Sequence, residues 1–127
     1  MHKSKLAGFI IDCQTNSLPD AARFWSEALG MPIAPLPGEE GEKYTRLLDK
    51  SGLLHVEVQA VDHESRVHLD IETDNVEAEI ARLQHLGATV VDHVQSWCIM
   101  QAPTGQRFCV VRKVSDTFEQ QANSWRD

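Results

Sequence analysis

The chain has 127 residues, of which 42% are hydrophobic and 24% are charged, and its net charge is −7. This length suits one globular domain, and an acidic chain without a Lys/Arg-rich run argues against a nucleic-acid partner. The sequence has no long apolar span and no signal-peptide pattern, so we expect no membrane association. Cys13, Cys98 and Cys109 are odd in number and form no CxxC pair, which favours free thiols in the cytoplasm.

The first half of the chain is expected to begin with a strand over residues 5–13, followed by a helix. Ser17 is the expected cap of that helix, and Pro19 lies in its first turn. Apolar residues, Trp25 among them, then recur at helical spacing until Gly30, so the helix buries one stripe. Three short strands are expected next, over residues 31–34, 43–48 and 53–61, with a loop at 35–41.

The second half repeats this order. A strand over residues 66–73 leads into a helix with Asp74 as the expected cap, Glu77 at the capping-box spacing and Gly87 at its end. Three further strands are expected, over residues 88–93, 96–101 and 106–113. The tail of residues 114–127 is polar except for Phe118 and Trp125, which indicates docking onto a surface, its own or that of a neighbouring chain.

The two halves match residue by residue. The helix ends correspond at an offset of 57 residues (Gly30 with Gly87), and the leading strands correspond at an offset of 60 (Gly8 with His68). The sequence therefore predicts an α+β fold with two β-α-β-β-β units, at about residues 5–61 and 66–113, in a single domain of residues 1–127. Such a duplication also indicates a binding site where the halves meet.

Several strands alternate between apolar and polar side chains. In the strand of residues 66–72 one face is apolar and the other is rich in groups that titrate or bind ions: Arg66, His68, Asp70 and Glu72. Comparable polar faces occur in the strands that contain Asp12, Glu57 and Cys109. One solvated face is common in antiparallel sheets, but four such strands with Cys109 among them favour a shared cavity.

Four segments of the chain resemble the vicinal oxygen chelate superfamily, which is the glyoxalase, bleomycin-resistance and extradiol-dioxygenase group. The resemblance is to its glyoxalase-like branch in particular and covers nearly the whole chain. The segments are FWSEALG at 24–30, RVHLDI at 66–71, LQHLGA at 83–88 and PTGQRFCV at 103–110. The resemblance implies that the two units form a curled mixed sheet, or cup, with the helices outside. It leaves the reaction open, because function on a shared fold depends on the site.

The resemblance also bears on metal binding. In the metal-dependent members, four cup-facing positions supply His and Glu ligands to a divalent ion. His68 matches one of them, whereas the others fall at Gly8, at Cys109 in place of a glutamate, and at Gln59, with Glu57 one step along the same face. Because a working site needs three good protein ligands, we expect no resident metal. If a divalent metal does bind, its ligands are His68, Glu57 and Cys109, a set that favours softer ions than magnesium.

We predict that a small organic ligand contacts eight residues on the polar strand faces: Glu57, Gln59, Arg66, His68, Asp70, Trp97, Arg107 and Cys109. His68 is either a base or anchor for that ligand, or a cavity histidine paired with Asp70 or Glu57. The two arginines either hold a carboxylate or phosphate or pair with neighbouring acids. Cys109 is either a nucleophile with a base nearby or a passive, half-buried thiol.

The leading hypothesis for function is a small glyoxalase-like domain that binds an organic molecule in its cup without the usual metal. One alternative is a lyase or isomerase on an oxygenated substrate, with or without a metal, in which His68 is the catalytic base. A further alternative is a drug-sequestering protein. Open sheet edges predict a homodimer, and pairing of the units either within one chain or between two chains stays open.

Overall fold

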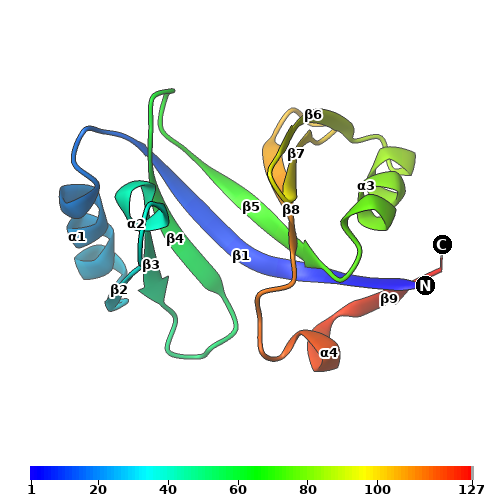
Figure 1. Ribbon diagram of the computed structural model, residues 1–127, viewed down its shortest axis with the longest axis horizontal. Helices are drawn as coiled ribbons and strands as arrows, with labels where there is room; N and C mark the ends of the chain where they lie inside the picture. Colours follow the sequence, from blue (N-terminus) through cyan, green and yellow to red (C-terminus); the bar gives the residue numbers. More distant parts are fainter. Residues whose placement is uncertain (127) are drawn as a thin grey trace. The chain divides into compact units, whose positions relative to one another are not determined.

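A computed structural model describes residues 1–126 of the chain (Figure 1). Nine strands and four helices occur in this range. In chain order they are β1 (His2–Gln14), α1 (Leu18–Leu29), β2 (Ile33–Pro35), α2 (Glu40–Lys43), β3 (Tyr44–Leu48), β4 (His55–Val61), β5 (Arg66–Thr73), α3 (Val76–His85), β6 (Thr89–Val94), β7 (Trp97–Gln101), β8 (Arg107–Arg112), α4 (Phe118–Gln121) and β9 (Asn123–Trp125). None of these helices has the length and apolar character that a membrane crossing requires.

The chain divides into two compact units. The first unit is residues 8–67, and the second is residues 1–7 together with the chain from residue 68 onward. The strand order is β2-β3-β4-β1 in the first unit and β5-β8-β7-β6 in the second, with β9 paired to the start of β1. β1 and β4 are parallel, as are β5 and β8, whereas the hairpin pairs are antiparallel. The predicted α+β fold with a mixed sheet is therefore confirmed.

In the first unit, α1 packs on one face of β3 and β4. Its Leu18 joins a buried cluster with Leu47, Val56 and Val58. The helix begins after the predicted cap Ser17, whose hydroxyl accepts a hydrogen bond from the Asp20 N–H at 3.3 Å. It ends at Gly30, which has a φ of 68° that L side chains rarely adopt. The other face of β4 consequently points away from this helix.

In the second unit, α3 covers one face of β7 and β8. The cluster beneath it consists of Ile80, Leu83, Ala88, Cys98, Met100 and Val110. The prediction of Asp74 as the helix cap is wrong by one residue, because Asn75 is the cap and its side chain accepts the Ala78 N–H at 3.1 Å. The Asp74 carboxylate instead accepts the Lys3 N–H at 2.9 Å. It thereby holds the start of α3 to β1.

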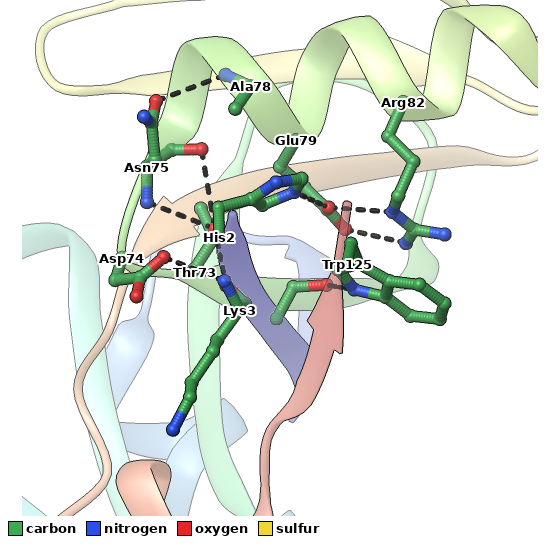
Figure 2. A network of polar contacts seen from close by, with 10 residues as sticks. His2, Lys3, Thr73, Asp74, Asn75, Ala78, Glu79, Arg82 and Trp125 are labelled. Carbon is green, nitrogen blue, oxygen red and sulfur yellow. Dashed lines mark hydrogen bonds and ion pairs between the residues drawn. The ribbon is translucent and has the colours of Figure 1, made fainter. Parts of the chain in front are cut away.

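A buried polar network joins β1, α3 and β9 within the second unit (Figure 2). Glu79 is 0% exposed and His2 is 3% exposed, and His2 Nε2 lies 2.7 Å from Glu79 Oε1. Arg82 donates two hydrogen bonds of 2.8 Å to the same carboxylate and stacks 4.0 Å above the ring of Trp125. The indole N–H of Trp125 donates to Ser4 Oγ at 2.8 Å. Desolvation raises the pKa of Glu79, but the hydrogen bonds from Arg82, His2 and Ser4 outweigh it and keep the pKa below its usual value.

The C-terminal segment docks onto its own chain. Phe118 is 1% exposed, and the Lys113 ammonium lies 5.6 Å from the centre of its ring. The buried Glu72 carboxylate accepts the backbone N–H groups of Val114 and Ser115, both at 3.0 Å. The sequence left open whether the segment with Phe118 and Trp125 docks onto its own chain or onto a neighbouring chain. The structure shows that it docks onto its own chain.

Candidate functional site

One sheet face of the second unit carries five of the eight predicted ligand residues. The side chains that alternate with the α3-facing core point away from α3: His68 and Asp70 on β5, Trp97 on β7, and Arg107 and Cys109 on β8. Cys109 is opposite Asp70 in the parallel pair and opposite Ile99 in the antiparallel pair. Strand pairing thus brings β5, β7 and β8 residues together on this face.

His68, Asp70 and Cys109 form a compact group, which we call the His68 cluster. An imidazole nitrogen, a carboxylate oxygen and the thiol sulfur all lie within 4.8 Å of one another. His68 Nε2 is 3.4 Å from Asp70 Oδ1, an ion-pair distance, and the two side chains are only 13% and 14% exposed. Asp70 Oδ1 is buried and accepts no hydrogen bond from the described residues. The cluster therefore combines an imidazole, a thiol and a carboxylate oxygen that accepts no hydrogen bond from the described residues.

Arg107 adds a positive charge beside the His68 cluster. It precedes Cys109 by two residues on the same face of β8, which corresponds to about 7 Å along a strand. Gln101 accepts a hydrogen bond from Arg107 Nε at 3.0 Å and fixes the guanidinium. Within residues 1–126, Arg107 forms no ion pair with an acid, so its terminal nitrogens can meet a carboxylate. The partly buried Trp97 lies on the same face.

The remaining predicted residues lie in or at the end of the first unit. Glu57 Oε2 is 2.7 Å from His55 Nε2, and these side chains are 12% and 17% exposed. His55 is therefore partly buried beside Glu57. Gln59 donates to the Tyr44 hydroxyl at 2.9 Å. Arg66 Nε is 3.9 Å from Asp12 Oδ2, so its acidic neighbour lies on β1.

Sequence reasoning missed two residues on this face of the first unit. Tyr44 and Arg46 alternate with the buried Thr45 and Leu47 along β3, and Arg46 is directly opposite Glu57. Arg46 Nε is buried without a hydrogen-bond partner among the described residues. The signal was present, because β3 has the same period-two pattern that identified its neighbours.

A cavity of about 370 Å³ lies elsewhere in the second unit, at the start of α3. Its charged lining residues are Asp74, Glu77, Arg112 and Lys113, so acids and bases are mixed. It contains no member of the His68 cluster and no titratable group with a catalytic partner. The sheet face with the His68 cluster is chemically the stronger candidate site.

Comparison with known protein families identifies the family of this chain. A family model described as a glyoxalase-like domain matches residues 8–111. The chain belongs to the glyoxalase-like domain family. The resemblance to the vicinal oxygen chelate superfamily is thereby confirmed.

Solved structures share the fold of this glyoxalase-like chain at low sequence identity. A hypothetical protein of Bacillus halodurans matches with a TM-score of 0.63 and 12% identity, over 89% of this chain and 96% of that chain. The methylmalonyl-CoA epimerase of Mycobacterium tuberculosis matches with a TM-score of 0.62 and 14% identity, over 86% and 87%. A Legionella pneumophila structure titled as an NAD-dependent benzaldehyde dehydrogenase matches with a TM-score of 0.58 and 9% identity, over 80% and 96%. No curated protein matches the chain. The likenesses establish the fold and leave the activity to the site.

The metal site of metal-dependent superfamily members does not fit this chain. A Cβ atom added to Gly8 would lie 1.9 Å from the His55 carbonyl oxygen, so no side chain can occupy that ligand position. In the first unit Ile10 pairs with Glu57, and in the second unit Asp70 pairs with Cys109. Ile10 and Asp70 correspond at the 60-residue offset, so Glu57 is the counterpart of Cys109. Glu57 is engaged by His55 at 2.7 Å. The His68 cluster offers N, O and S donors that would suit a soft cation, but they are not the His and Glu set of the family.

Proposed function

We propose that this glyoxalase-like protein binds a small organic carboxylate on the sheet face opposite α3, without a resident metal. The observation that carries the proposal is the half-buried His68 cluster with Arg107 two residues away on the same strand face. Arg107 holds the ligand carboxylate through its terminal nitrogens. A hydroxyl or carbonyl group about 7 Å further along the strand meets Asp70 or His68, and Trp97 provides apolar contact.

A ligand of this class supplies what the face lacks. Asp70 Oδ1 is a buried acceptor without a hydrogen bond from the described residues, and buried acceptors are nearly always paired in folded proteins. A ligand hydroxyl satisfies it. The missing side chain at Gly8 and the thiol at Cys109 support binding without the family's metal.

The test is a screen of small carboxylic acids by saturation-transfer NMR, covering 2-oxo acids, 2-hydroxy acids, dicarboxylic acids and acyl thioesters with a free carboxylate. At least one class is expected to bind, and Arg107→Ala should weaken its affinity about tenfold or more, because a charged hydrogen-bond pair is lost. Arg112→Ala is the matched control, since Arg112 lies on the same strand but on the other face and is exposed. Equal effects of the two variants, or no binding by any class, would refute the proposed site.

The second candidate function is an isomerase or lyase that moves a proton next to a carbonyl group. The His68–Asp70 ion pair favours it, because a carboxylate beside an imidazole orients a general base. Some structural neighbours are titled as epimerases. The same NMR mixtures in D₂O distinguish this candidate: loss of a ligand C–H signal that depends on His68 indicates catalysis, and unchanged ligand spectra indicate binding alone.

We further propose that the protein is a cytoplasmic homodimer. The three cysteines are free thiols, which supports a reducing compartment. Leu6 and Leu69, on β1 and β5 of the second unit, are 48% and 52% exposed, and exposed apolar side chains on strands favour a partner surface.

Light scattering at low micromolar concentration is expected to give about twice the 14.3 kDa mass of one chain. Leu69→Lys should give the mass of a monomer, because burial of a lysine charge in the interface is costly. Leu86→Lys is the control, since Leu86 is 63% exposed at the end of α3, and it should stay dimeric. A wild-type protein of monomer mass would exclude the dimer.

A further inference from the structure

We propose that Cys109 is a reactive nucleophile toward small α,β-unsaturated carbonyl compounds, with His68 as its base and Asp70 as the group that steadies the imidazole. The thiol sulfur, an imidazole nitrogen and a carboxylate oxygen lie within 4.8 Å of one another. A nucleophile, a base and an orienting carboxylate close to one another are the parts that thiol nucleophiles use. This activity goes beyond ligand binding, because it forms a covalent bond.

The three thiols of the chain differ in surroundings, and only Cys109 has these parts around it among the described residues. Cys98 is 0% exposed in the core under α3, and burial raises the pKa of its thiol. Cys13 is half-buried beside Trp25, and burial, opposed by a Trp25 hydrogen bond, raises the pKa of its thiol as well. Cys109 is partly exposed on the face opposite α3, where a small molecule can approach it.

The reaction is an addition in which atoms and electrons balance. The Cys109 thiol gives its proton to the His68 imidazole, and the sulfur forms a bond to the β-carbon of the unsaturated carbonyl compound. The C=C π pair moves to the α-carbon, which takes a proton back from the imidazolium. Asp70, with Oδ1 at 3.4 Å from His68 Nε2, stabilises the imidazolium between the two transfers. The product is a thioether, and no oxidant or reductant takes part.

The probe is N-ethylmaleimide, a small α,β-unsaturated dicarbonyl compound, applied to the full chain at pH 7 with EDTA present. Peptide mass spectrometry follows the labelling rate of each cysteine in the native protein and in the urea-unfolded chain. In the unfolded chain the three thiols have no fixed neighbours, so the labelling rate of each thiol there is the reference for its rate in the native protein. Native Cys109 is expected to react about tenfold faster than unfolded Cys109, because a base is in place. Native Cys13 and Cys98 are expected to react more slowly than their unfolded references.

Variants at the two partner residues complete the test. His68→Gln should remove most of the enhancement at Cys109, a loss of about tenfold, and leave the Cys13 rate unchanged. Asp70→Asn should lower the Cys109 rate by a smaller factor, because it weakens the orientation of the imidazole. Slow labelling of Cys98 verifies that each variant is folded; if His68→Gln is unfolded, Asp70→Asn and the wild-type comparison decide. A native Cys109 rate at or below the unfolded rate, or a folded His68→Gln variant with the full enhancement, would overturn the proposal. The carboxylate screen measures reversible binding and this labelling measures a covalent bond at Cys109, so the two proposals fail separately.

Discussion

Replacement of Glu79 by alanine is expected to lower the free energy of unfolding by about 3–5 kcal/mol, because it leaves the partly buried Arg82 guanidinium without its counter-charge. Arg82 loses two hydrogen bonds of 2.8 Å, and the 3% exposed His2 loses its hydrogen bond to Glu79. Urea unfolding at pH 7 measures the change, and the melting temperature should fall by about 10–20 °C.

Two other variants isolate the cause of this loss. Glu77→Ala changes an exposed acid on the same helix and should cost less than about 1 kcal/mol. Glu79→Gln keeps the shape of the side chain but removes its charge, and it should fall between the two alanine variants. If Glu79→Ala is no more destabilising than Glu77→Ala, the network in Figure 2 does not hold α3 to β1 and β9.

The pH dependence of this contribution follows from the lowered pKa of Glu79. In the unfolded chain the carboxyl titrates near its ordinary value of 4.5, and in the folded protein its pKa is lower. The contribution is therefore present above the unfolded pKa and is lost as the pH falls through the folded pKa. The stability difference between wild type and Glu79→Gln should be constant near pH 7 and shrink below about pH 4.5.

The buried network also shows where sequence reasoning reaches its limit. Periodicity placed α1 and α3, and Ile80 and Leu83 of α3 are core residues because both face the sheet at helical spacing. Glu79 lies on the same face of α3 as these core residues. From the sequence alone, an acidic residue at such a position is expected to be exposed to solvent unless its partners are known. Its partner Arg82 is three positions away, but its partner His2 is 77 positions away in the chain, so no local pattern could reveal the buried pair.

The candidate site was also only partly predictable from the sequence. The alternation of single strands correctly separated His68, Asp70 and Cys109 from the core-facing residues. Which polar residues become neighbours depends on strand register, and register is fixed by pairing between distant segments. Cys109 lies opposite Asp70, and Arg66 lies near Asp12 instead of the acids on its own strand. The prediction of the α3 cap was wrong for a more local reason. Asp74 and Asn75 are both good capping residues, and only the path of β1 selects between them.

Installation of the missing histidine at Gly8 is expected to disrupt the protein instead of restoring a metal site. A Cβ atom at Gly8 would lie 1.9 Å from the His55 carbonyl oxygen and 2.7 Å from the His55 nitrogen, both of them backbone atoms. Gly8 pairs with His55 in the parallel register of β1 and β4, so the clash can be relieved only by separating these strands. Gly8→His should therefore lower the free energy of unfolding by about 3 kcal/mol or more, or abolish soluble expression.

Two further variants decide whether the backbone contact is the cause. Gly8→Ala introduces the same Cβ without an imidazole and should be destabilised nearly as much as Gly8→His. Gly52→Ala is the control, because Gly52 has no atom within 4 Å of an added Cβ and its φ of 72° should cost only about 1 kcal/mol. Urea unfolding with and without micromolar zinc measures both stability and metal binding. A Gly8→His protein with wild-type stability, whose melting temperature rises with zinc and no longer rises when His68→Ala is added, would show that a single substitution separates this chain from metal binding. The steric explanation for the missing ligand would then fail, because the close approach of β1 and β4 would not be what excludes a side chain at position 8.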